Sequence, residues 1–140
     1  MKKVLMIAAI ALLAVACNKN QRAVKKLDGT WSATEYNVSE DGVTVDWMEE
    51  GFINSLTMMF EGCKLKDDEF CKVTVTIATE FGSDSEDDRY RVTNDGTTLE
   101  TKDDVSATTI HAMEIVDLSG SYLELKEEDD GQTIVIKLEK

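Results

Sequence analysis

Short stretches in which apolar and polar residues alternate, separated by turns that contain glycine, fill the chain from Gly29 to its C-terminus. The clearest are residues 71–79 and 132–139, where every second position over most of the stretch is apolar. Successive side chains of a β-strand point to opposite faces of a sheet, so this period of two predicts strands with one buried face. Asp-Gly pairs at 41–42, 95–96 and 130–131 are typical of hairpin turns.

The pattern predicts an all-β fold, because no stretch with a helical period is long enough to cover a sheet. An antiparallel sheet of this size with one apolar face must close on itself or split into two layers, and sequential hairpins favour closure. We therefore expect residues 27–140 to form one domain, an antiparallel up-and-down barrel of about eight strands. Closure would also remove edge strands, and the interior would hold side chains or one small ligand. The predicted strands are 30–38, 43–47, 55–61, 71–79, 89–93, 97–102, 108–116, 122–127 and 132–139.

Residues 1–16 have the layout of an export signal. Lys2 and Lys3 precede an apolar stretch, residues 4–15, that is too short to span a membrane comfortably. Small Ala16 then comes directly before Cys17. This arrangement resembles the signal peptide of bacterial lipoproteins, in which cleavage leaves the cysteine as an N-terminus that carries acyl chains such as palmitate. We expect lipidation at Cys17; the alternative is an ordinary secreted protein in which this cysteine has no role.

Residues 17–26 are predicted to be a lipidated tether between the signal peptide and the domain. Lys19, Arg22, Lys25 and Lys26 make the tether basic, whereas the whole chain has a formal net charge of −13. One interpretation is that the cations lie against anionic lipid headgroups, each adding about 1 kcal/mol of attraction near the surface. The other is a solubilising spacer. The acidic domain makes nucleic acid a poor partner.

The three cysteines fit a lipidated protein with one disulfide. If Cys17 is lipidated, Cys63 and Cys71 remain as a pair that flanks a polar stretch between two predicted strands. A bond between them would tie the neck of a hairpin and contribute about 2 to 3 kcal/mol of stability through the entropy of loop closure. A zinc site is the weaker alternative, because no histidine lies nearby. The pair also lacks the Cys-x-x-Cys spacing of redox enzymes.

Residues suited to catalysis or to metal binding are sparse. His111 is the only histidine, so a metal site of several imidazoles or a serine triad is hard to assemble. On an inward face with Met113 and Ile115 it could contact a ligand, but such a histidine is more often an ordinary interior or rim residue. The acidic stretches 84–88 and 127–131 lack the spacing of a calcium loop, and we expect both to be solvated loop tips. The sequence therefore predicts no enzymatic activity, no metal and no cofactor.

A resemblance to lipocalins lies in Gly29-x-Trp31 at the start of the first strand, followed in order by residues 90–99 and 115–125. Together with the export signal, these stretches make the chain similar to small lipocalin-like lipoproteins of Gram-negative bacteria. The resemblance implies that Trp31 closes the floor of the barrel. It also implies a lipid-anchored protein of the bacterial cell envelope, with the outer membrane as the expected location.

Two hypotheses for function follow. The first is a membrane-anchored protein that binds a small apolar or amphipathic ligand inside its barrel, and the second is an envelope interaction or structural protein whose barrel is filled. The sequence assigns no ligand-binding residues and no oligomeric state. Trp47, beside a loop, is a candidate contact at the rim.

Overall fold

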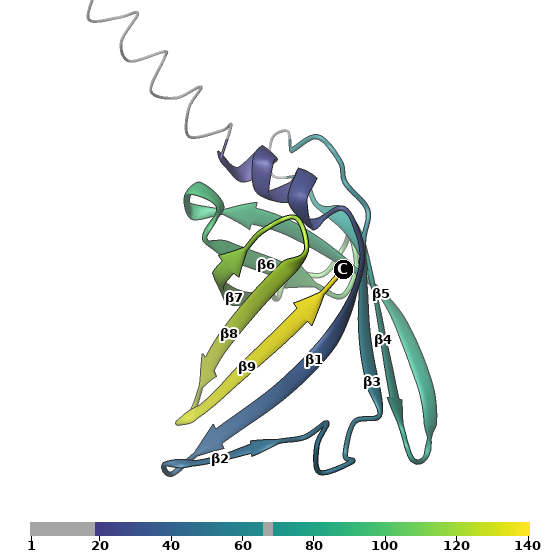
Figure 1. Cartoon of the computed structure of the whole chain (residues 1–140). Coiled ribbons are helices and arrows are strands. Elements are labelled where there is room, and N and C mark those ends of the chain that lie inside the picture. The colour runs from purple at the N-terminus through teal and green to yellow at the C-terminus, as the bar shows by residue number, and fades with distance from the viewer. Residues whose placement is uncertain (1–18, 66–68) are drawn as a thin grey trace, which may run out of the picture.

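The structure is a computed structural model that describes residues 19–65 and 69–140. The predicted signal peptide and Cys17 lie outside the described residues. A helix over residues 19–27 precedes nine strands (Figure 1). The strands are β1 (Gly29–Glu40), β2 (Val43–Asp46), β3 (Ser55–Phe60), β4 (Cys71–Thr79), β5 (Gly82–Thr93), β6 (Thr98–Lys102), β7 (His111–Leu118), β8 (Tyr122–Asp129) and β9 (Gln132–Glu139), and a 3-10 turn, η1 (Asn94–Gly96), lies between β5 and β6.

Eight of the strands form a closed antiparallel barrel. From β3 to β9 each strand pairs with the next along the chain, and β1 closes the ring by pairing with both β3 and β9. The ninth strand, β2, pairs with the far half of β1. The predicted all-β, antiparallel barrel is confirmed, and β4 and β9 have the bounds expected from their alternation.

The interior is densely filled at one end of the barrel, which we call the cap end. The helix, η1 and the chain end at Lys140 all lie there, as Figure 1 shows. The β1–β2, β4–β5 and β8–β9 turns lie at the opposite end, which we call the open end. The largest fully buried side chains are Trp31, Tyr90, Phe60, Leu27, Leu99, Leu123, Leu125 and Leu138.

The helix belongs to the folded domain, although the sequence predicted a tether over residues 17–26. Ala23, Val24 and Leu27 are buried against the barrel. The spacing of these residues places them on one helical face. Asn20 Oδ1 also accepts a hydrogen bond of 2.7 Å from Gly96 N. So short a helix is marginal in isolation, and tertiary packing is what stabilises it.

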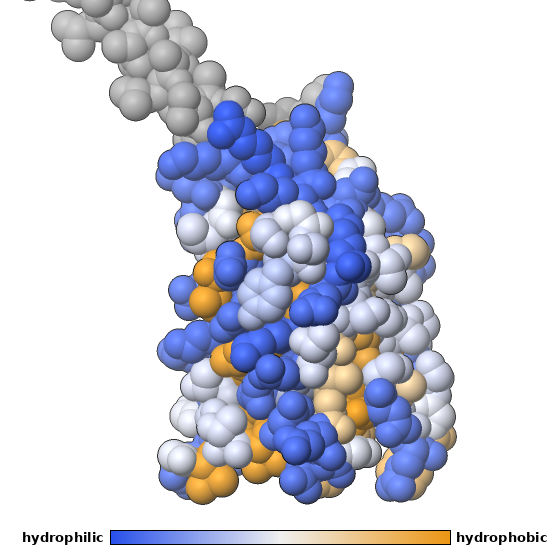
Figure 2. All heavy atoms as spheres, viewed as in Figure 1, coloured by the Kyte–Doolittle hydropathy of each residue, from blue (hydrophilic) through white to orange (hydrophobic). Residues whose placement is uncertain are grey.

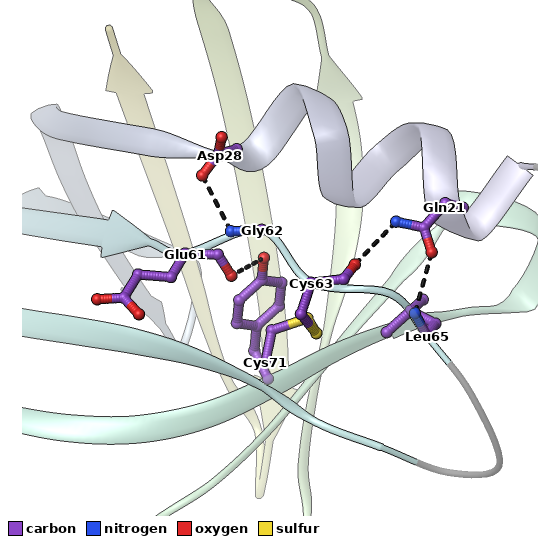
Figure 3. Close-up of a disulfide and its surroundings, with 8 residues drawn as sticks. Gln21, Asp28, Glu61, Gly62, Cys63, Leu65 and Cys71 are labelled. Carbon is purple, nitrogen blue, oxygen red and sulfur yellow. Dashed lines mark hydrogen bonds between the residues drawn. A yellow bond between two sulfur atoms is a disulfide. The ribbon is translucent and has the colours of Figure 1, made fainter.

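The disulfide predicted between Cys63 and Cys71 is confirmed, with 5.5 Å between the two Cα atoms. It joins the segment after β3 to the first residue of β4, beneath the helix (Figure 3). Gln21 of the helix donates to Cys63 O at 2.9 Å and accepts from Leu65 N at 3.0 Å. The disulfide thus fixes the segment on which the helix rests.

Strand β5 is longer than predicted, and its first half is an exposed edge. The expected loop tip at residues 84–88 is wrong, because these residues pair with β4. The pairing between β5 and β6 starts only at Arg89, so residues 82–88 have a neighbouring strand on one side only within the described part of the chain. Closure therefore does not protect this edge, and its carboxylates do so instead, since charged side chains disfavour edge-to-edge pairing.

Candidate functional site in the open half of the barrel

Strand register decides which side chains of the open half face the interior. Residues directly opposite each other in an antiparallel pair share one face of the sheet. Buried Val73 lies opposite Asp88. Further towards the open end, Val75 lies opposite Glu86, and Ile77 lies opposite Asp84. The first half of β5 therefore turns three carboxylates towards the interior.

These carboxylates line a cleft of about 270 Å³ together with Val75 and Ile77 of β4. Asp88 lies deepest, and its pKa is raised above the usual range by burial and by the negative charges of Glu86, Asp103 and Asp87. His111 acts in the opposite direction on this carboxyl group. We call this cleft the acidic wall.

A second cleft, of about 420 Å³, lies on the inward face of the β1–β2 hairpin. Val38 of β1 lies opposite Val45 of β2, and Glu40 lies opposite Val43. We call this cleft the apolar wall because aliphatic side chains and an indole dominate it. Its lining residues are Val38, Glu40, Asp41, Val43, Val45, Trp47 and Gln132.

The indole of Trp47 is held in place by a small aromatic cluster. Its ring stacks on Tyr36, with 5.7 Å between the centroids and 23° between the planes. Phe52 packs edge-on against the indole, with 6.1 Å between the centroids. Trp47 nevertheless remains 38% exposed. The cluster therefore presents a rigid, partly uncovered aromatic surface at the rim, where the sequence placed Trp47.

Backbone hydrogen bonds fix the turn that carries this cluster. Trp47 N donates to Tyr36 O at 2.8 Å, and Trp47 O accepts from Ile53 N at 3.0 Å. The carboxylate of Asp46 accepts from Tyr36 N at 3.2 Å and from Met48 N at 2.9 Å. Asp46 thus satisfies two backbone donors that the end of β2 leaves free.

Tyr36 connects the apolar wall to β8. Burial raises the pKa of its phenol, and the negative charge of Glu127 raises it further. Glu127 lies opposite Ile134, which in turn lies opposite Val38, so all three belong to the inward face. Glu127 therefore adds a carboxylate to the inward face of the open half, where Glu40 also lies.

His111 lies at the start of β7, opposite Thr101 and on the same face as Met113. Its side chain is exposed, so it is a rim residue of the open half. No group of three histidine, cysteine or acidic side chains among the described residues is arranged to hold a metal ion. Likewise, the described part of the chain has no helix long and apolar enough to cross a membrane.

Gly29 and Trp31 form a structural unit at the cap end, away from both clefts. Trp31 is fully buried and its Nε1 donates to Leu27 O at 2.6 Å. The ammonium group of Lys140 lies 5.0 Å from the centroid of the indole and donates to Lys26 O and Asp28 O. A Cβ atom on Gly29 would lie 2.7 Å from Lys140 Cε, so glycine makes room for this contact.

Apart from Trp47, the sequence did not identify the residues of the two walls as a site. Val43, Val45, Asp84 and Glu86 lie on strands far apart along the chain, and the register of the barrel decides that their side chains lie on its inward face. Figure 2 shows hydrophobic atoms gathered near the β1–β2 turn, where Val43 is exposed. Trp47, the predicted contact at the rim, is the one lining residue that the sequence singled out.

Comparisons with known proteins support the fold. No protein-family model and no curated protein matches the sequence. A crystal structure of a lipocalin-like protein from Bacteroides uniformis is similar, with a TM-score of 0.50 and 16% identity over 80% of this chain and 97% of that one. The siderocalin Ex-FABP, described as functioning through dual ligand specificities, is similar with a TM-score of 0.53 and 13% identity over 82% of this chain and 73% of that one. The protein thus has a lipocalin-like fold.

Proposed function

We propose that this protein binds a small apolar or amphipathic molecule in the open half of its barrel. The observation that carries the proposal is the pair of clefts, one mainly apolar and one acidic, on inward-facing residues at the end of the barrel away from the helix. Concave apolar surface with a few polar groups is typical of ligand sites. A ligand on the apolar wall would remove Val43, Val45 and Trp47 from water, and this burial is the driving force for binding.

The acidic wall restricts the charge of such a ligand. Asp84, Glu86 and Asp88 face the interior from β5, and Glu127 faces it from β8. A carboxylate or a phosphate brought into this half of the barrel would be repelled by these four groups and by Glu40 of the apolar wall. The ligand we propose is therefore an amphipathic molecule with an uncharged or positively charged polar end.

A titration with three probes of equal chain length, dodecanol, dodecylamine and dodecanoate, tests the proposal. The variant Trp31→Phe leaves Trp47 as the only tryptophan, so its fluorescence reports binding at the apolar wall. We expect dodecanol and dodecylamine to bind and dodecanoate to bind at least tenfold more weakly. Val45→Asp should abolish the signal. The control Val116→Ala removes apolar surface far from the site and should leave the affinities unchanged.

The envelope interaction hypothesis remains the second candidate, because the open end also carries exposed aromatic residues. Phe81, at the β4–β5 turn, is 92% exposed, and Phe52 is 61% exposed. If none of the three probes binds, a scaffold role is favoured. A reproducible protein partner in whole-cell cross-linking, lost in the variant Phe81→Ala, would then support it.

We further propose that acyl chains on Cys17 anchor the protein in the bacterial envelope, with the outer membrane as its location. Support comes from the sequence alone: the basic residues, the apolar stretch and the small residue before the cysteine. Burial contributes about 0.8 kcal/mol per methylene, so two or more chains hold a protein firmly. In cell fractionation, Cys17→Ser should move the protein out of the membrane fraction, and unchanged fractionation would refute lipidation.

A further inference from the structure

A groove on the cap end combines cations with apolar side chains. One side is the helix, which contributes Lys19, Arg22 and Lys26, and the other is residues 115–118 of β7. Its volume is about 310 Å³. The three cations are spaced by three and four residues, so they lie on one helical face. Because Ala23, Val24 and Leu27 are buried against the barrel, the barrel fixes that face in position.

The cations of the groove are only partly neutralised. Lys19 Nζ lies 3.9 Å from Asp95 Oδ2, and both side chains are more than half exposed. Asp117 is the other carboxylate in the lining. Within the part of the chain that the structure describes, Arg22 and Lys26 form no salt bridge. Both remain available for an anionic partner.

We infer that the cap end docks on an anionic lipid surface, with headgroup phosphates in this groove and the open end pointing away from the bilayer. Guanidinium and ammonium groups are the usual partners of phosphate. Val116 is exposed at the groove and offers apolar contact beside the charges. Hydrophilic side chains cover the helix, as Figure 2 shows.

The charge distribution gives this docking a direction. The helix holds four cations and no acidic residue, whereas all 28 acidic residues of the chain lie at or after Asp28. An anionic surface therefore attracts the helix and repels the barrel. The open end, with the acidic wall and exposed Phe81, then faces the aqueous side, which leaves the clefts accessible. This inference does not depend on the proposed ligand.

Vesicle sedimentation tests the docking with residues 18–140, which contain the complete described core. We expect binding to phosphatidylcholine vesicles that contain phosphatidylglycerol, weak binding to pure phosphatidylcholine, and release as salt screens the attraction. Each cation contributes about 1 kcal/mol near an anionic surface, roughly a fivefold change in partitioning. The double variant Arg22→Gln, Lys26→Gln should therefore partition about 25-fold more weakly.

Two lysines on the strands of the barrel provide the matched control. The double variant Lys102→Gln, Lys126→Gln removes the same amount of charge from strands β6 and β8. It should change partitioning onto anionic vesicles far less. The inference would be overturned if the protein bound equally to vesicles with and without phosphatidylglycerol. It would also be overturned if the helix variant and the barrel variant lost the same amount of vesicle binding. Binding of inorganic phosphate without any preference for anionic vesicles would overturn it too and would indicate a soluble anion site. If the double variant Phe52→Ala, Phe81→Ala lost vesicle binding and the helix variant did not, the open end and not the cap end would contact the bilayer, and the inference would be wrong.

Discussion

At the scale of single residues, Trp31 joins the helix to the barrel. Its indole is fully buried and hydrogen-bonded to Leu27 O. Replacing it by alanine should lower the free energy of unfolding by about 3 to 5 kcal/mol, because a large cavity forms at the cap end. Urea unfolding measures this change. Trp47→Ala is the matched control and should cost well under half as much, since Trp47 is partly exposed; similar costs would contradict the assignment of Trp31 to the core.

Asp88 is predicted to destabilise the fold at neutral pH. Its pKa is raised in the folded protein, mainly by burial, so the folded state holds the proton more strongly than the unfolded state. Ionised Asp88 therefore lowers the free energy of unfolding at any pH above its pKa in the folded state. This destabilisation disappears below pH 3.8, the ordinary pKa of an aspartate, where the carboxyl group is protonated in both states. Asp88→Asn should raise the thermal midpoint at pH 7, and the gain should shrink as the pH falls towards that value.

Asp104, unlike Asp88, is predicted to stabilise the fold at neutral pH. Hydrogen bonds from the Ser106 hydroxyl and from the backbone of Ser106 and Ala107 hold its pKa below the usual range. Its ionised form stabilises the fold above the unfolded pKa, and this contribution is lost as the pH falls through the folded value. Asp104→Asn should therefore lower the midpoint at pH 7. The same direction of change for both variants would contradict these two pKa shifts.

At the scale of elements, the disulfide connects β3 to β4 and supports the helix. Its loop spans a sequence separation of 8 residues. Reduction should lower the free energy of unfolding by about 2 to 3 kcal/mol through the entropy of the unfolded chain. Comparing urea midpoints with and without reductant measures the effect. The variant Cys63→Ala, Cys71→Ala should be insensitive to reductant, and a wild-type midpoint that did not move would refute the prediction.

For the molecule as a whole, the exposed edge of β5 sets a limit on solubility. Within the described part of the chain, residues 82–88 have a neighbouring strand on one side only, and charged side chains disfavour pairing with another strand on the other side. The double variant Asp84→Thr, Glu86→Thr removes two carboxylates from this edge. We expect it to self-associate, increasingly so at higher concentration, and size-exclusion chromatography measures this. Glu114→Thr, Glu124→Thr removes two carboxylates from positions paired on both sides and should stay monomeric. Equal behaviour of the two variants would show that the edge is not the cause.

The sequence by itself determined the closed antiparallel barrel, the disulfide and most of the strands, with the first half of β5 as the main exception. A period of two is a local property, visible without knowing which strands are neighbours. Asp-Gly turns are equally local, and residues 71–79 and 132–139 consequently form strands with the expected bounds. Cys63 and Cys71 are the two cysteines that remain to pair if Cys17 is lipidated, as we propose.

Only the tertiary structure decided where the helix packs and where the candidate site lies. Residues 19–27 are helical because Ala23, Val24 and Leu27 find an apolar end of the barrel to cover, and their sequence reads equally well as a basic tether. The acidic residues of β5 resemble a loop tip until β4 pairs with them. Whether a strand's inward face is filled or open depends on its neighbours around the ring, and that information is absent from any single stretch of sequence.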